Sequence, residues 1–193
     1  PPLGIIRGIN ELTYNWKDGH APEYKVPSSF AASFDSGTGH IRIPDSDSLS
    51  FGDGATDSSF SIAAWVYIPT TVSSPGTILS KYNSFASNSE YYLSHNPFNQ
   101  LTLVLIDTSA AVSISAFKTG AFTLGKWQHV AVTFDSTSPD PEDGIEMYID
   151  GTLQILDNRI GNVSYVAMEN GTAPLRIGTL ATTTDPFEGK MSN

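Results

Sequence analysis

Apolar and polar residues alternate in short stretches along most of the chain, and the clearest case lies between residues 124 and 153. Apolar residues occupy every second position through 130–134 and, after an acidic loop, through 145–149. The second stretch ends in Asp150-Gly151, a dipeptide typical of a two-residue hairpin turn. Strand, loop, strand, tight turn and strand is the order expected of an antiparallel meander.

Similar short stretches fill residues 29–118 and 153–178, and no segment has the 3.6-residue period of an amphipathic helix. We therefore predict an all-β fold, a two-sheet antiparallel sandwich. The further strands are expected at 29–34, 40–43, 60–68, 77–81, 91–94, 101–106, 112–117, 153–156 and 175–178. The residues expected to face the core are Phe60, Ile62, Ala64, Val66, Val130, Val132, Phe134, Met147 and Ile149.

The strand at 60–68 also carries large aromatic residues at the opposite parity, Trp65 and Tyr67. A strand with apolar side chains at both parities is expected to be buried on both faces. We accordingly predict that Trp65, and Trp127 in the strand at 127–134, belong to the core.

The first thirty residues differ from the rest. They hold four of the twelve prolines and carry Tyr14, Trp16 and Tyr24, without sustained alternation. We predict an extended arm or linker over 1–30 and one domain over 31–193. The arm either packs on its own domain or reaches another chain, and the sequence leaves both open.

Composition restricts the partners. The net charge of −10 would repel a phosphate backbone or an anionic membrane, so nucleic acid is a poor partner. The chain has no cysteine, and no apolar run is long enough to span a bilayer, so membrane insertion is not expected. Charged residues make up only 16% of the chain. This balance suits a protein that works outside the cytoplasm.

Several blocks resemble one family in their order and spacing. They read SFDSGTGHIRIPDSDSLSF, FSIAAWVYIP, TILSKYN, YYLSH, LGKWQHVAVTFD, EMYIDGTL, APLRIGT and FEGKMSN. Residues 31–193 are similar to the laminin-G-like jelly rolls of the concanavalin A-like lectin/glucanase superfamily. The resemblance implies a jelly-roll sandwich, and it does not specify a ligand because one fold hosts many functions.

The resemblance also implies that the first and last strands are neighbours in one sheet. Residues 187–193 should then pair with residues 31–34. Family members usually continue with one more strand, so an exposed edge is expected, and unpaired edges promote association. The candidate covers are a partner strand or the arm, through Leu3, Ile5, Ile6 and Ile9.

Catalytic motifs are missing. Glycosidases of this superfamily place paired carboxylates two residues apart on one strand, whereas Glu146 and Asp150 lie four apart with Asp150 in the turn. No Gly-x-Ser-x-Gly elbow is present, and the histidines are scattered. We predict that the chain is not an enzyme.

Calcium is a possible cofactor because an acidic protein offers oxygen ligands in several loops. Asp35 is the best single candidate, and the loops 53–57 and 140–143 are weaker ones. The alternative for each is an Asx turn, in which the carboxylate bonds its own backbone. Ser192 stands where many relatives have a metal-binding acid, which counts against a structural calcium ion.

A ligand rim is predicted where exposed aromatic rings would lie beside amides. The candidate ligand-binding residues are Tyr82, Asn83, Tyr91, Tyr92, His95 and Asn96. The alternative is that the tyrosines simply cover a sheet.

The favoured function is a lectin-like binding or adhesion module, extracellular or on a surface, for a glycan or a surface protein. A structural protein of a virion, filament or cell-surface layer, assembled through residues 1–30, is the alternative; an accessory domain of a glycan-processing enzyme is a weaker one.

Overall fold

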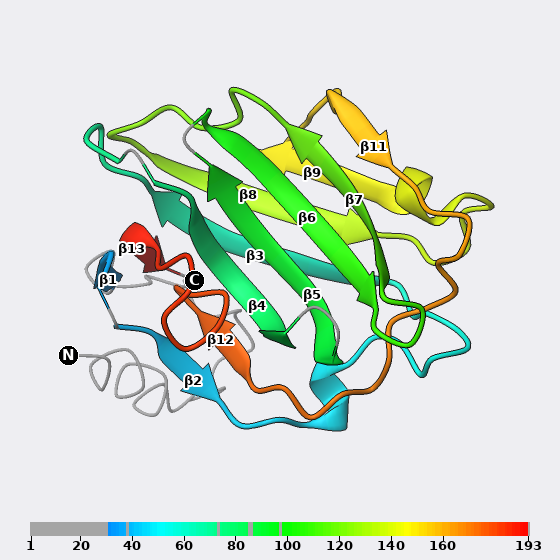
Figure 1. Cartoon of the computed structure of the whole chain (residues 1–193). Coiled ribbons are helices and arrows are strands. Elements are labelled where there is room, and N and C mark those ends of the chain that lie inside the picture. The colour runs from blue at the N-terminus through cyan, green and yellow to red at the C-terminus, as the bar shows by residue number, and fades with distance from the viewer. Residues whose placement is uncertain (1–30, 38, 73, 85–86, 97, 193) are drawn as a thin grey trace, which may run out of the picture.

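The computed structural model describes residues 31–37, 39–72, 74–84, 87–96 and 98–192, and these residues form two antiparallel sheets packed face to face (Figure 1). The six-stranded sheet has the order β1 (Ala32–Asp35), β13 (Glu188–Ser192), β3 (Phe60–Tyr67), β8 (Trp127–Phe134), β9 (Ile145–Ile149) and β10 (Thr152–Leu153). The seven-stranded sheet has the order β11 (Asn158–Ile160), β7 (Val112–Lys118), β6 (Gln100–Asp107), β5 (Ser87–Asn96), β4 (Gly76–Ser84), β12 (Leu175–Ile177) and β2 (Ile41–Ile43).

The predicted all-β sandwich is confirmed. Two short 3-10 turns, η1 (Asp47–Leu49) and η2 (Pro141–Gly144), are the helical elements of the described residues. None of them is long and apolar enough to cross a membrane.

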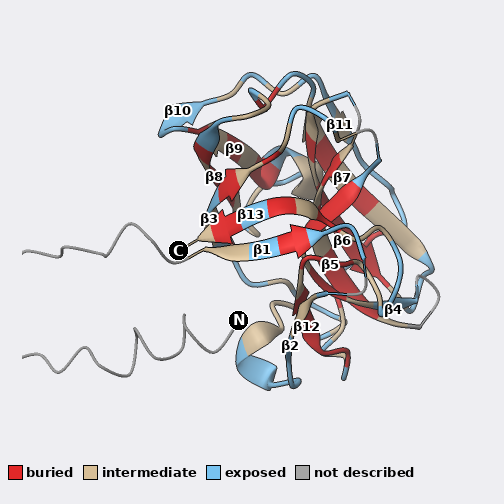
Figure 2. Ribbon diagram, turned by 90° about the vertical axis from the view of Figure 1, so that its left-hand side faces the viewer, coloured by how far each residue is buried: buried red, intermediate tan, exposed pale blue. Residues whose placement is uncertain are grey.

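Alternation explains the core. β3 and β8 pair over their whole length, from Phe60 opposite Phe134 to Tyr67 opposite Trp127, so their period-two apolar residues share one face. Val130, Val132 and Met147 are fully buried between the sheets, while Ile62 and Ala64 pack against the core without complete burial. Figure 2 shows buried residues along the strands where the two sheets meet. All nine predicted core positions face inward.

The predicted hairpin forms at Asp150-Gly151. Both residues have positive φ, 49° and 76°, and Thr152 stands opposite Ile149 in the ladder. Two consecutive positive φ values are the requirement of a type I′ turn, which Asp-Gly meets. The strand that follows is shorter than the predicted 153–156, because β10 ends at Leu153.

The predicted pairing of the first strand in the chain with the last is confirmed: Ala32 stands opposite Met191 and Phe34 opposite Gly189. β1 is one of the two edge strands of its sheet (Figure 2), and β10 is the other. The prediction that the arm covers an edge falls on residues 1–30, which lie outside the described part.

Candidate functional site

The predicted ligand rim is not assembled, because two of its members belong to the core. Tyr91, 2% exposed, lies among the core residues, and its hydroxyl donates to the carbonyl of Leu49 at 2.8 Å. His95, also 2% exposed, lies edge-on to Phe122 and Phe187. On β5 these side chains share the parity of Leu93, which faces inward. Assigning Tyr91 and His95 to a binding surface was therefore wrong.

The other four residues are spread along two strands. The rings of Tyr82 and Tyr92 meet edge to face, with centroids 5.9 Å apart, and Asn83 is exposed. Asn96 lies at the far end of β5, where its Oδ1 accepts the N–H groups of Phe98 and Gln100 in the β5–β6 turn. Ligand binding by Tyr82, Asn83, Tyr92 or Asn96 stays a prediction.

The candidate calcium ligands make local turns. Oδ1 of Asp35 accepts the N–H of Gly37 at 3.1 Å, and Oδ1 of Asp53 accepts those of Ala55 and Thr56. Within the described ranges, no three histidine or acidic side chains gather as a metal-binding group. Calcium at Asp35 stays a prediction.

The outer side of the six-stranded sheet carries an aromatic surface. Trp65 is 44% exposed and Trp127 is 40% exposed, so the prediction that both belong to the core was wrong. The surface, which we call the aromatic face, consists of Trp65, Tyr67, Trp127, His129 and Tyr148.

Strand register assembles this face. Trp65 stands opposite His129, with ring centroids 5.4 Å apart, and Tyr67 stands opposite Trp127 at 5.8 Å. The two indoles are thus diagonal neighbours across the β3–β8 ladder, close enough for one ligand to touch both. The ammonium of Lys190 lies 5.5 Å from the centre of the Tyr67 ring.

Small and polar residues accompany the aromatic residues. The remaining outward positions of β3, β8 and β9 are Ser61, Ala63, Ala131, Thr133 and Glu146. Valine, isoleucine, leucine and methionine are missing from these outward positions. The mixture of small and polar residues was the sequence signal for an exposed face, and the two tryptophans obscured it.

A second feature is a hollow where β5 and β6 meet the loop 169–173. Its volume is about 460 Å³, and its lining residues are Asn88, Ser89, Thr108, Ser109, Glu169, Gly171 and Thr172. This size lies within the range of small-molecule sites. Within the lining, the carboxylate of Glu169 and the hydroxyls of Thr108 and Ser109 are hydrogen-bonded to the protein, and the amide of Asn88 is a further polar group.

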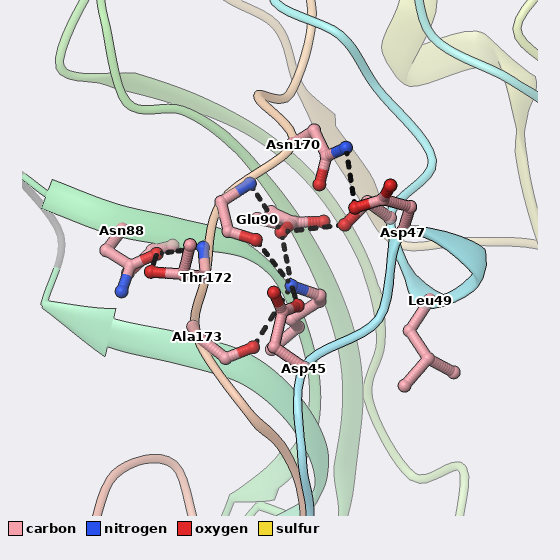
Figure 3. A network of polar contacts seen from close by, with 12 residues as sticks. Asp45, Asp47, Leu49, Asn88, Glu90, Asn170, Thr172 and Ala173 are labelled. Atoms are coloured by element: carbon pink, nitrogen blue, oxygen red, sulfur yellow. Dashed lines mark hydrogen bonds and ion pairs between the residues drawn. The ribbon is translucent and has the colours of Figure 1, made fainter.

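A buried ion pair is bonded to the loop that lines the hollow, and Figure 3 draws this polar network. Nζ of Lys81 lies 2.7 Å from Oδ1 of Asp45 and 2.7 Å from Oε1 of Glu90, and the side chains of Lys81 and Glu90 are not exposed. The ammonium also donates to the carbonyl oxygens of Gly171 and Ala173, both at 3.0 Å. Burial raises the pKa of Glu90, although the hydrogen bond and the charge of Lys81 act to lower it.

The two carboxylates considered for catalysis have structural partners. Oε2 of Glu146 accepts the hydroxyl of Tyr148 at 2.5 Å, and Oδ1 of Asp150 accepts the N–H of His129 at 2.8 Å. Glu146 is on β9 and Asp150 is in the hairpin turn, so the two lie on different elements.

Comparison with solved structures gives likeness of fold. The CBM40 domain of a Ruminococcus gnavus IT-sialidase, bound to α2,3-sialyllactose, matches with a TM-score of 0.52 and 13% identity, covering 80% of this chain and 88% of that one. Domains LG4-5 of the mouse laminin α1 chain match with a TM-score of 0.54 and 14% identity, over 85% of this chain and 41% of that one. Domain 4 of AbnA, a GH43 extracellular arabinanase from Geobacillus stearothermophilus in complex with arabinotriose, has a TM-score of 0.51 and 18% identity, over 84% and 67%.

No curated protein matches the sequence. The family model Laminin_G_3, described as the concanavalin A-like lectin/glucanases superfamily, matches residues 35–193, which is most of the chain and includes both sheets. The chain therefore belongs to the concanavalin A-like lectin/glucanase superfamily, as a laminin-G-like domain.

Proposed function

We propose that this chain is a non-catalytic, lectin-like module that binds a glycan on the aromatic face. The observation that carries the proposal is the pair of exposed indoles, Trp65 and Trp127, on one side of one sheet. The C–H groups of a sugar ring carry a weak positive charge, and they stack on the electron-rich face of an aromatic ring. Ser61, Thr133 and Glu146 lie on the same side and offer hydrogen-bonding groups to sugar hydroxyls.

The composition of the face favours a sugar over an apolar protein partner. The core of a protein interface is rich in aromatic residues, but it also buries aliphatic ones. Here the outward positions of β3, β8 and β9 combine aromatic rings with alanine, serine and threonine. Two structural neighbours, the CBM40 domain and the arabinanase domain, are glycan complexes, which supports the same class of ligand.

A glycan array followed by titration calorimetry tests the proposal. The double variant Trp65→Ala/Trp127→Ala should weaken binding at least tenfold, which corresponds to about 1.4 kcal/mol. Trp65→Leu keeps an apolar side chain but removes the ring, and it should bind as weakly as Trp65→Ala.

The matched control is Tyr82→Ala/Tyr92→Ala on the seven-stranded sheet. Loss of binding in this control, with full binding by the tryptophan variants, would move the site to the surface first predicted from the sequence. Failure of the unmodified chain to bind any arrayed glycan would refute the proposal.

Absence of catalysis is part of the proposal. No hydrolysis of neutral polysaccharides is expected, since Glu146 and Asp150 are held on different elements. Release of reducing sugar that disappears in Glu146→Gln would contradict this. As a binding module the chain would act outside the cytoplasm, either alone or as an accessory domain of a glycan-processing enzyme, the setting of the CBM40 neighbour.

A structural role in a virion, filament or cell-surface layer stays the alternative, and it depends on residues 1–30. Deleting residues 1–28 should then lower stability or abolish assembly. An unchanged melting temperature and an unchanged sedimentation coefficient would remove its support.

A further inference from the structure

The wall of the hollow beside β5 and β6 is fixed at every residue of the loop 169–173. Glu169 accepts the N–H groups of Thr108 and Ser109 at 2.7 and 2.9 Å, and the side chain of Asn170 donates to Asp47 at 3.3 Å. Gly171 donates to Glu90 at 3.0 Å.

The same wall is held from inside the sandwich and from β5. Thr172 donates its N–H to Oδ1 of Asn88 at 2.6 Å, and Lys81 holds the carbonyls of Gly171 and Ala173. A Cβ atom at Gly171 would lie 2.7 Å from Oδ1 of Asn88, so a larger residue at this position would displace that amide. A wall fixed before a ligand arrives reduces the entropy that binding would otherwise cost.

Lys81 occupies the centre of an oxygen cage. Four oxygen atoms, from Asp45, Glu90, Gly171 and Ala173, lie within 3.0 Å of its ammonium (Figure 3). Carboxylate and carbonyl oxygens from separate segments are also the ligands that calcium takes in loop sites. The cation that joins these segments is therefore the side chain of Lys81 on β4. Unlike a bound calcium ion, it cannot dissociate.

The hollow has hydrogen-bonding groups of the kind that sugar hydroxyls use. Oδ1 of Asn88 is engaged by Thr172, which leaves the Nδ2 donors of the same amide for a ligand. Thr172 also lines the hollow, and its hydroxyl lies 3.5 Å from Oδ1 of Asn88.

Charge restricts the ligand. Glu169 lines the hollow, and no lysine or arginine is among the lining residues. Of the three arginines in the described part, Arg42 lies on β2, Arg176 donates to the carbonyl of Tyr82 and Arg159 donates to that of Ile145. An anionic sugar would meet the carboxylate of Glu169 without a cation to balance it.

From these contacts we propose that the hollow is a second saccharide site, which binds one uncharged sugar residue and whose wall is held by Lys81 instead of a calcium ion. This site is separate from the aromatic face. The hollow lies between β5, the turn after β6 and the loop 169–173, whereas the aromatic face lies on the outer side of the six-stranded sheet.

Saturation-transfer NMR with methyl β-galactoside, methyl β-glucoside and sialyllactose tests the site on the full chain. At least one methyl glycoside should receive saturation, and the signal should fall at least fivefold in Asn88→Asp and in Thr172→Val. Asn88→Asp keeps the acceptor for Thr172 and loses the donors, while Thr172→Ser keeps the hydroxyl and should recover most of the signal that Thr172→Val loses. Unchanged signals in Asn88→Asp and Thr172→Val would overturn the proposal, as would a sialyllactose signal that exceeds those of the methyl glycosides and falls in Asn88→Asp.

The two proposed sites fail independently. If the saturation signals persist in Trp65→Ala/Trp127→Ala and are lost in Asn88→Asp, the methyl glycosides bind in the hollow, whatever the result of the glycan array. The reverse pattern overturns the hollow and leaves the aromatic face.

Calcium provides the last arm of the test. The saturation signals of the unmodified chain should change neither in EDTA nor in calcium chloride at about 5 mM. This concentration is enough to fill an extracellular calcium site with a millimolar dissociation constant. Loss of the signals in EDTA would overturn the assignment of Lys81 as the cation that holds the wall.

Discussion

Nζ of Lys81 lies 2.7 Å from Oε1 of Glu90, and both side chains are sealed from solvent between β4, β5 and the loop 169–173. A buried ion pair needs further hydrogen bonds to offset its loss of hydration. Here Asp45 and two backbone carbonyl groups accept hydrogen bonds from the ammonium of Lys81, and Ser50 and Gly171 donate hydrogen bonds to the carboxylate of Glu90. Oε2 of Glu90 has no hydrogen-bond partner, so the pair is held by one carboxylate oxygen.

Replacing Lys81 by methionine should therefore destabilise the domain by about 3–5 kcal/mol, since it leaves Glu90 buried without a counter-charge. Chemical denaturation measures the change. The control is Lys118→Met, which removes a partly exposed pair with Asp157 and should cost less than about 1 kcal/mol. The double variant Lys81→Met/Glu90→Gln should recover part of the loss; equal stability of Lys81→Met and the unmodified chain would contradict the burial of the pair.

Two neighbouring residues of β8 test the orientation of the strand. Val132 is fully buried, so Val132→Asp should unfold the domain, because an unpaired buried carboxylate costs at least several kcal/mol. Thr133→Asp places the same charge one residue later on the outer face and should leave the protein folded. Circular dichroism during heating distinguishes them, and similar melting curves for the two variants would refute the assignment of faces.

His95 should make stability depend on pH. Burial lowers its pKa, so the unfolded chain binds the proton more readily than the folded one. The stability that neutral His95 contributes is present above the unfolded pKa of about 6.5 and is lost as the pH falls below it towards the folded pKa.

The measurement is the free energy of unfolding between pH 7.5 and 5.5 for the unmodified chain and for His95→Phe. The unmodified chain should lose stability across this window relative to the variant, in which the group cannot titrate. Parallel curves would show that His95 does not titrate differently in the two states. Glu90 and Asp57, whose pKa values burial raises, act in the opposite direction and are common to both proteins.

The aromatic face should be visible in fluorescence. Trp16→Phe removes the tryptophan that lies outside the described residues, so the emission comes from Trp65 and Trp127. Because both indoles are about two-fifths exposed, acrylamide should quench them readily, and a bound glycan should reduce that quenching. Quenching as weak as that of a buried indole would contradict their exposure.

Alternation predicted the strands and their inward residues well, because one apolar residue in every two is enough to define a face. It did not decide which large side chains face outward. Trp65 and Tyr67 have the parity of Ser61 and Ala63, and those small neighbours marked the outer face. Tyr91 and His95 have the parity of Leu93, which marked the inner one.

The oxygen cage around Lys81 could not be predicted from the local sequence pattern. Its carbonyl partners lie 90 and 92 residues away along the chain, and Asp45 lies 36 residues away. A lysine on a strand is ordinarily exposed, and only the folded arrangement of three distant segments makes its burial favourable. The loop 169–173 has no periodic pattern, so its place beside β5 could not be predicted either.

The pairing of β1 with β13 bears on how such a domain joins a longer polypeptide. Ala32 at the start of one strand lies opposite Met191 near the end of the other, so polypeptide leading into the sandwich and polypeptide leading out share one corner. Bringing two neighbouring points together closes a short loop, and the entropy cost of that closure is small. The sandwich could therefore be inserted into a surface loop of a host protein without separating the two ends of that loop.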